Sequence, residues 1–372
     1  MNPATPGLLR GIGIVAGLEL RQRMRSRVLL ILAIVWFVVI GAVTVVTWFI
    51  LDAGASAYET SVQGFPMFSV IVYFVLLFGT LVAPAVSAGS IGADRAAATL
   101  ATTQVTMLGP WAILLGKALA AWLTGIAFLV VASPFVVASL TFGQFSASRL
   151  LLALLALVLQ IGLFTIIGVG LSALISSQVF AIVTAYLVVA LLSVGTLIAF
   201  ALAAGLSTQY VEVESRTLTD EYWEAVDACD PDDSSCFDAV PETCEPTVDT
   251  WPVTDTTRSW WVLALNPYVV VADTVTTGQG GPSRDRWADD DLFSTIAGAV
   301  RSMQVAETAE PGYDECAPAA FETPDEGDLD DTVPVWWLGM TLQTVLALLA
   351  LGGGYRRLRT PARHMPRGSR IA

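Results

Sequence analysis

VLLILAIVWFVVIGAVTVVTWFIL, the stretch from Val28 to Leu51, contains no charged residue and carries 17 Leu, Ile, Val or Phe residues among its 24. A helix of about 20 apolar residues, rising about 1.5 Å per residue, crosses a bilayer core. A cleaved signal peptide is the alternative interpretation, since the small residues Ala53-Gly54-Ala55 follow. Signal peptides have apolar cores of about 7 to 15 residues, so a retained membrane span is favoured.

Five further uncharged apolar runs follow the first, in a chain of 372 residues that is 55% hydrophobic and 14% charged. The mean hydropathy is +0.66, well above that of a soluble domain. A large soluble core could bury one such helix, but six together predict an all-α polytopic membrane protein with six transmembrane helices. The other five runs are Met67 to Ala88, Ala118 to Phe142, Leu150 to Ile175, Val179 to Gly205 and Val335 to Gly354.

Basic residues predict the orientation, because Lys and Arg near the ends of spans resist translocation. Thirteen of the 19 basic residues lie before the first span, between spans two and three, or after the last span. Of the acidic residues, only Glu19 and Asp94 share these segments. We therefore expect a multi-pass protein of the cell membrane with cytoplasmic N- and C-termini. The basic residues are Arg10, Arg21, Arg23, Arg25, Arg27, Arg95, Lys117, Arg356, Arg357, Arg359, Arg363, Arg367 and Arg370.

Residues 206–332 hold 29 of the 33 acidic residues and only five Arg, which predicts a large extracytoplasmic insertion between spans five and six. It is either a solvated cap, or a segment whose negative field, from runs such as Asp289-Asp290-Asp291, concentrates cationic substrates, cations or a basic partner near the exit. All four cysteines lie here, as expected in an oxidising compartment. Of three possible pairings, we expect one local bridge and one long bridge to Cys316. The candidates are Cys229, Cys236, Cys244 and Cys316.

A metal site in this insertion is disfavoured, because zinc binding would need His or paired CxxC spacing and the single His is His364, near the chain's other end. The apolar run from Trp260 to Val271 is too short for a seventh span and contains Asn266-Pro267. A re-entrant or interfacial hairpin near 260–275 is predicted instead.

The predicted organisation has five parts. Residues 1–27 form a helix on the inner leaflet, or alternatively a solvated basic tail. Five spans occupy 28–205 and include a cytoplasmic elbow at 89–117. The insertion at 206–332, the sixth span at 333–354 and a basic cytoplasmic tail at 355–372 complete the chain.

Residues that could carry chemistry are scarce. Gly116-Lys117 is followed by Ala118 and lacks the earlier glycine of a phosphate-binding loop. No span carries a charged side chain or His that could bind a coupling ion, and Gln160 is expected to bond across a helix interface. We expect no enzyme activity and no cofactor in this chain, so any transport would draw its energy from another subunit.

The elbow reads GADRAAATLATTQVTMLGPWAILLGK from Gly92 to Lys117. Its charged start, the Thr102-Thr103-Gln104 patch and the Gly109-Pro110 break predict two short helices at the membrane surface, the second ending at Lys117. A partner pushing on such an elbow would move two spans together.

This segment resembles the cytoplasmic coupling region of ATP-binding-cassette (ABC) exporter permeases of the type-2 class. In that family an acidic residue precedes Gly-Thr-Leu, then a turn with Pro and Ser, then an aliphatic run ending in Gly-Lys. Asp94, Thr99-Leu100 and the run from Ile113 to Lys117 match, whereas Ala98 replaces the glycine and Met107 to Pro110 replaces the turn. Three other features are similar to the family: Glu19 to Arg23 before span one, Leu265 to Tyr268 before the last span, and Tyr355 to Arg357 after it.

The resemblance implies a half-transporter that pairs with a second permease copy, identical or paralogous, in the lipid bilayer. Each copy would rest on a cytoplasmic ABC ATPase subunit, with no nucleic acid involved. The outer hairpin, Asn266, Pro267 and Tyr268, would gate release. The implied ATPase-coupling residues are Asp94, Arg95, Thr99, Leu100, Thr102, Thr103 and Gln104.

Two other functions remain open from the sequence. The chain could be a membrane-anchored sensor or scaffold whose acidic ectodomain binds a partner. A secondary transporter is disfavoured by the lack of charge within the spans.

Overall fold

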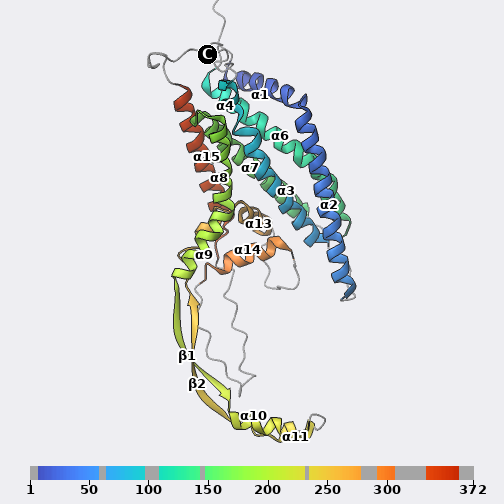
Figure 1. Cartoon of the computed structure of the whole chain (residues 1–372), viewed down its shortest axis with the longest axis vertical. Coiled ribbons are helices and arrows are strands. Elements are labelled where there is room, and N and C mark those ends of the chain that lie inside the picture. The colour runs from blue at the N-terminus through green and yellow to red at the C-terminus, as the bar shows by residue number, and fades with distance from the viewer. Residues whose placement is uncertain are drawn as a thin grey trace, which may run out of the picture. The chain divides into compact units, whose positions relative to one another are not determined.

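The computed structural model describes residues 7–57, 64–96, 109–142, 147–230, 234–277, 291–305 and 332–359. They divide into two compact units, one formed within 1–197, 262–298 and 334–372, the other within 198–261 and 299–333. The first unit is a helical bundle (Figure 1).

Among the described residues, six helical segments are long and apolar enough to cross a membrane, which fits a multi-pass membrane protein. All six agree with the predicted runs, and no seventh was found in this part of the chain. They are Arg27–Gly54, Pro66–Arg95, Pro110–Ser139, Ala147–Leu174, Gln178–Leu206 and Trp336–Leu358.

The segments belong to named elements with slightly different ends. The first three spans contain α2 (Arg27–Ala57), α3 (Gly64–Ser87) with α4 (Ser90–Ala96), and α6 (Pro110–Ser139), which is followed by the 3-10 turn η1 (Leu140–Phe142). The others contain α7 (Ala147–Leu174), then α8 (Gln178–Ala190) with the π-turn η2 (Leu191–Gly195) and α9 (Thr196–Leu206), and finally α15 (Trp336–Leu358).

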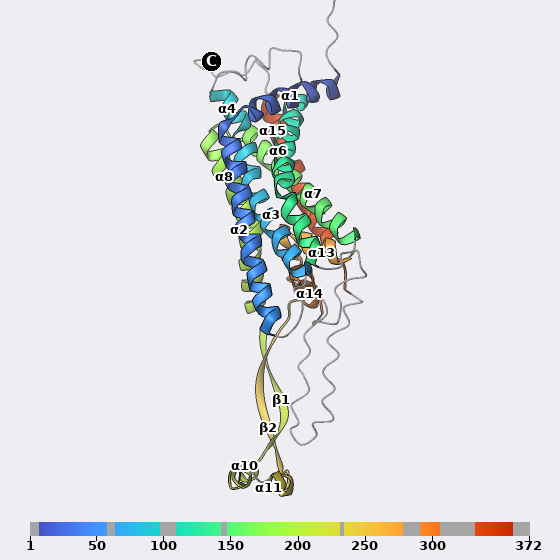
Figure 2. The same ribbon diagram turned by 90° about the vertical axis from the view of Figure 1, so that its right-hand side faces the viewer.

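Shorter helices lie at the two ends of the bundle. At one end is α1 (Leu8–Met24), with α4 and the last turns of α15; at the other are α13 (Pro267–Thr277) and α14 (Leu292–Ser302) (Figures 1 and 2). We call these the basic end and the hairpin end, after Arg21, Arg23, Arg95, Lys117 and Arg357 at the first and the hairpin of α12 (Trp261–Ala264) and α13 at the second.

An apolar core fills the bundle between these ends. Trp36 of α2 is 1% exposed, stacks on Phe78 of α3 and donates from Nε1 to the Phe128 carbonyl of α6 at 3.1 Å. Phe293 of α14 is fully buried and lies in the same core. The buried faces of α2, α3, α6 and α14 are therefore held as one body, which positions both ends.

The elbow differs from its prediction in one respect. No separate second helix ends at Lys117, because residues 110–117 are the first turns of the continuous helix α6. Pro110 suits the first position of a helix. The helix then continues without a break through Lys117 and Ala118. The preceding residues, 97–108, lie outside the described part of the chain.

The second unit contains strand, which the all-α prediction missed. Strand β1 (Thr208–Leu218) pairs antiparallel with β2 (Cys244–Thr254), from Thr208 opposite Thr254 to Leu218 opposite Cys244. β-branched residues such as Val211 and Val213 favour a strand, whereas the acidic composition of the segment indicates solvation. The other regular elements among the described residues are helices.

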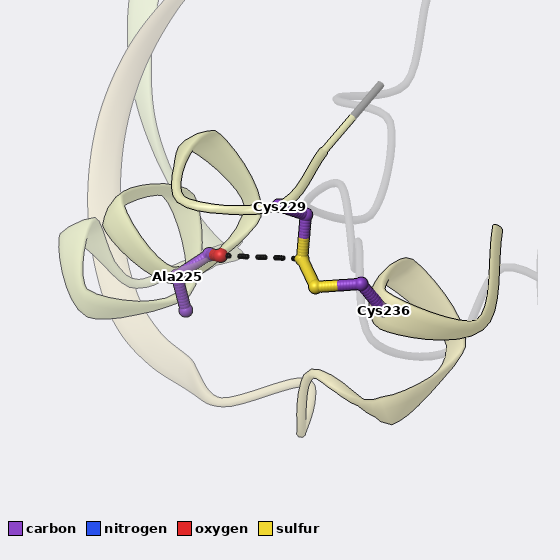
Figure 3. The surroundings of a disulfide bond; sticks show 3 residues. All are labelled: Ala225, Cys229 and Cys236. Atoms are coloured by element: carbon purple, nitrogen blue, oxygen red, sulfur yellow. Dashed lines mark hydrogen bonds between the residues drawn. A yellow bond between two sulfur atoms is a disulfide. The ribbon is translucent and has the colours of Figure 1, made fainter. Parts of the chain in front are cut away.

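A disulfide joins Cys229, two residues after α10 (Asp220–Asp227), to Cys236 within α11 (Ser234–Ala239) (Figure 3). The predicted local bridge is therefore confirmed. Cys244 is also disulfide-bonded, and Cys316, the residue of the predicted long bridge, lies outside the described residues. The Cys229 sulfur approaches the Ala225 carbonyl oxygen at 3.6 Å, a contact rather than a hydrogen bond because a disulfide sulfur carries no proton.

Candidate functional site

Charged side chains from three helices gather around Lys117 at the basic end. Its Nζ lies 2.8 Å from Asp94 Oδ2, pairs with Glu19 Oε1, and donates to the Ser90 carbonyl at 3.3 Å. The lysine side chain is 5% exposed, against 17% for Glu19 and 29% for Asp94. One buried ammonium thus joins α6 to both α1 and α4. We call Glu19, Asp94 and Lys117 the Lys117 junction.

Arg23 extends the junction toward span two. It lies one turn after Glu19, with Nε 3.5 Å from Glu19 Oε2. Its guanidinium donates to Thr124 Oγ1 at 3.2 Å and to the Val86 carbonyl at 3.1 Å. Burial lowers the pKa of Arg23, and the Glu19 carboxylate opposes that shift. Two cations and two carboxylates therefore share this site, so its formal charge balances.

Glycine permits the close crossing that brings these charges together. A Cβ at Gly116 would lie 2.6 Å from Val15 Cβ and 3.1 Å from the Ile12 carbonyl oxygen. Only glycine lets α1 approach α6 this closely beside Lys117. The buried side of α1 includes Gly11 and Ala16, which are also small.

Arg95, a predicted coupling residue, bonds to the end of α7. Its guanidinium donates to the Ala173 carbonyl at 2.8 Å and the Ile175 carbonyl at 3.1 Å. Arg357 of α15 donates to the neighbouring Leu174 carbonyl. These carbonyls end a helix and have no partner inside it, so two arginines satisfy them and complement the helix dipole.

The start of α4 is attached to α7 as well. The Ser172 hydroxyl accepts from the backbone N–H of Ile91 at 3.0 Å and of Gly92 at 3.3 Å. α4 is thus bonded to α7 through its backbone and Arg95, and to α1 and α6 through Asp94 and Lys117.

The other predicted coupling residues, Thr99, Leu100, Thr102, Thr103 and Gln104, lie outside the described residues. Sequence reasoning placed Glu19 and Lys117 in separate motifs and did not pair them. The available signal was a lone lysine at the start of an otherwise apolar span, which needs a carboxylate partner when buried.

The hairpin end joins helices through neutral polar groups. Asn266 is 2% exposed and its Nδ2 donates to the Ser193 carbonyl at 2.7 Å and to Thr196 Oγ1 at 3.0 Å. Ser193 lies in the π-turn η2, where wider spacing disturbs the usual helical bonds. Asn266 Oδ1 accepts from the Tyr268 N–H at 3.0 Å, and Pro267 begins α13. The predicted hairpin residues therefore form a helix start bonded to span five.

The same hairpin is bonded to two more spans. Tyr73 of α3 donates from its hydroxyl to the Tyr268 carbonyl at 3.3 Å. Buried Asp273 accepts from the N–H groups of Val335 and Trp336, at 2.6 and 2.9 Å, and so caps the start of α15. A Cβ at Gly339 would lie 2.1 Å from the Ala264 carbonyl oxygen. Spans two, five and six thus meet at one hairpin.

Within the described residues, no group of three or more His, Cys, Asp or Glu side chains is placed to hold a metal ion. The arrangement at both ends can hold helices together and transmit movement between them. No family model, no curated protein and no solved structure matches this chain.

Proposed function

We propose that this chain is the membrane-spanning permease subunit of an ATP-driven ABC exporter of the cell membrane. Its termini and the elbow at 89–117 would face the cytoplasm, and the insertion at 206–332 would lie outside. A separate ATPase subunit and a second permease copy would complete the machine. The order of the family-like motifs supports this proposal, and the observation that carries it is the buried Lys117 junction.

The junction gives a physical route for coupling. An ATPase pressing on α4 would load Asp94, and the Asp94–Lys117–Glu19 pairs would pass that load to α6 and α1. α1 ends at Met24, just before α2 begins at Arg27, so span one would follow. Arg95 would pull on the end of α7 at the same time. Buried ion pairs suit this role, because parting them exposes uncompensated charge.

Release would occur at the hairpin end. The Asn266 bonds to Ser193 and Thr196 tie the hairpin to span five, and the Asp273 cap ties it to span six. Rearrangement of the spans at the basic end would strain these bonds and open the hairpin.

The test separates binding of the ATPase from coupling. The chain is purified from its native membrane, so that a bound ATPase copurifies with it, and is compared with a variant in which residues 99–104 are scrambled and with Lys117→Met. We expect scrambling to abolish copurification. Lys117→Met should keep the ATPase bound but lose the stimulation of ATP hydrolysis by the permease. Arg258→Gln, which alters an exposed ion pair in the second unit, is the matched control and should change neither.

If an intact complex contains no ATPase, and scrambling 99–104 has no effect, the permease proposal fails. A folding defect in Lys117→Met is separated by the double variant Asp94→Asn, Lys117→Met, which removes the Asp94–Lys117 pair and leaves Glu19 paired with Arg23. That variant should also bind the ATPase without coupling.

A membrane-anchored sensor or scaffold is the second candidate. Its support is that residues of 198–261 and 299–333 form a compact unit of their own with a disulfide. Replacing 209–253 by a short Gly-Ser linker distinguishes the two. A permease should keep its ATPase and its stimulated hydrolysis, whereas a sensor should lose its partner.

A further inference from the structure

Two buried glutamines face the seam between α7 and α15, and their amides are incompletely bonded. Gln160 of α7 is 0% exposed and Gln343 of α15 is 1% exposed. Among the described residues, neither Gln160 Oε1 nor Gln343 Oε1 has a hydrogen-bond partner. A buried acceptor without a donor destabilises the fold, so such groups are rare in native structures and call for an explanation.

The orientation of the Gln343 amide follows from its one strong bond. Nε2 donates to the Leu265 carbonyl at 3.0 Å. Exchanging the amide nitrogen and oxygen would set two acceptor oxygens against each other. Gln343 Oε1 therefore points away from Leu265 and remains free to accept.

Reversing the Gln160 amide does not satisfy it either. Nε2 lies 3.9 Å from Met340 Sδ, and a thioether is only a weak acceptor with no proton to donate. In either orientation Gln160 has a free acceptor oxygen. Met340 and Gln343 are three residues apart on α15 and so share a face. The two amides therefore follow one another along the same seam.

A third side-chain oxygen without a hydrogen-bond partner belongs to span five. Ser193 Oγ has no partner among the described residues, although the Ser193 carbonyl accepts from Asn266. Asn266 follows Leu265, whose carbonyl holds Gln343. The neighbouring side chains are apolar: the cluster that contains Leu265 includes Phe164 of α7 and Leu192 of η2. Free acceptors on spans four and six, and a free hydroxyl on span five, thus occur in an apolar setting.

We propose that Gln160 and Gln343 form an intramembrane site for one small O–H or N–H donor group. Two amide oxygens accept hydrogen bonds and cannot recognise an anion, so the site selects water, a hydroxyl or an ammonium. The donor has two sources, resident water or the polar group of an amphipathic cargo. Only the second source rests on the proposed function.

The test measures the infrared absorption of the Gln160 side-chain carbonyl. The full chain is labelled with glutamine carrying 13C in its side-chain carbonyl and reconstituted in nanodiscs without an ATPase. The infrared difference spectrum between wild type and Gln160→Met isolates the carbonyl of Gln160. We expect this band at the lower frequency of a hydrogen-bonded amide. Thr344→Val, on the exposed side of the same α15 turn, is the control and should leave the glutamine band unchanged.

Two probes identify the source of the donor. A bonded band without added solute assigns the donor to resident water. A free band that becomes bonded with 1-octanol or octylamine, but not with octane, assigns the site to an amphiphile. A band that stays at the free position under all conditions overturns the proposal.

Stability supplies an independent reading. With a donor in place, Gln160→Met removes a satisfied bond and should lower the midpoint of thermal unfolding by about 2 °C. With the acceptor empty, the same variant removes a destabilising group and raises the midpoint, which contradicts the proposal. The experiment contains no ATPase, so failure of the exporter proposal leaves its outcome unaffected.

Discussion

The two ends of the helical bundle join their helices by different chemistry. At the basic end, opposite charges meet around Lys117, and α1, α4 and α6 depend on one buried ammonium. At the hairpin end, Asn266 and Gln343 reach backbone carbonyls, and Asp273 accepts from backbone N–H groups. The first junction depends on charge balance, whereas the second depends on fit, because amides bond only at short range and in defined directions.

This contrast suggests a division of labour. Ion pairs can part and re-form with a change in charge or load nearby, so the basic end suits a region that receives a signal. Side-chain bonds to the backbone hold one geometry until it is broken, so the hairpin end suits a latch. Variants that change charge without shape, or shape without charge, should therefore separate the two ends.

The largest effect is expected at Lys117. Lys117→Met keeps most of the side-chain length but removes the ammonium that the partly buried carboxylates of Glu19 and Asp94 share. Removing one partner of a buried pair costs about 3–5 kcal/mol of unfolding free energy. The measurement is denaturant or thermal unfolding of the purified chain in detergent.

The control for Lys117→Met is the double variant that adds Asp94→Asn, which keeps the Glu19–Arg23 pair. It should recover most of the lost stability, because one cation and one carboxylate are removed together and the charge of the site stays balanced. Equal stability of Lys117→Met and wild type would show that the junction does not hold the three helices together.

An intermediate effect is expected at the hairpin end from shape alone. Gly339→Ala places a methyl group 2.1 Å from the Ala264 carbonyl oxygen and 2.4 Å from Val270 Cγ2. The hairpin must shift, which should cost about 1–3 kcal/mol. Gly352→Ala on the same helix is the matched control, since a Cβ there meets nothing within 4 Å. It should be neutral or stabilise α15 by up to about 1 kcal/mol, as measured by thermal unfolding.

If Gly339→Ala and Gly352→Ala behave alike, the close contact between α15 and the hairpin is not tight in solution. A difference between them that disappears when Asn266 is also replaced by Ala would show that the Asn266 hydrogen bonds and the close contact at Gly339 stabilise the hairpin together.

The sequence predicted the spans well because each depends on a local property, the length of an apolar run. The bounds were less accurate: α6 begins at Pro110, eight residues before the predicted Ala118, because the helix includes Lys117, at which the uncharged run stops, and the largely apolar residues before it. The ribbon of β1 and β2 was missed because only pairing between distant strands stabilises it.

The sites were predicted only in part, for the same reason. Asp94 and Arg95 were singled out, but their partners Lys117 and Ala173 are brought close by the fold. Asn266 was identified as a hairpin residue, yet its bond to Ser193 spans 73 positions and uses a π-turn that has no clear sequence signal. Short-range chemistry could be predicted, whereas contacts distant in sequence could not.

The smallest effect is expected at Asp291, an acidic residue near the hairpin end. Asp291, predicted as part of an acidic run, is buried and caps α14: Oδ1 accepts from the N–H of Phe293 at 2.7 Å, and Oδ2 from the Ser294 hydroxyl at 2.8 Å. Burial raises the pKa of Asp291, and the hydrogen bonds from Ser294 and Phe293 oppose that shift. The folded protein therefore holds this proton more tightly than the unfolded chain does.

The sign of the pH dependence follows from linkage. The stability that Asp291 contributes is fully present below the ordinary pKa of an aspartate and is lost as the pH rises through its raised folded value. Asn caps a helix about as well as Asp but carries no charge. The stability of Asp291→Asn relative to wild type should therefore increase as the pH rises from about 4. This increase should be smaller than the roughly 1 kcal/mol that losing the cap in Asp291→Ala costs. Unfolding midpoints of the three proteins across pH measure this. A stability difference between Asp291→Asn and wild type that stays constant across pH would show that the Asp291 carboxylate is solvated rather than buried.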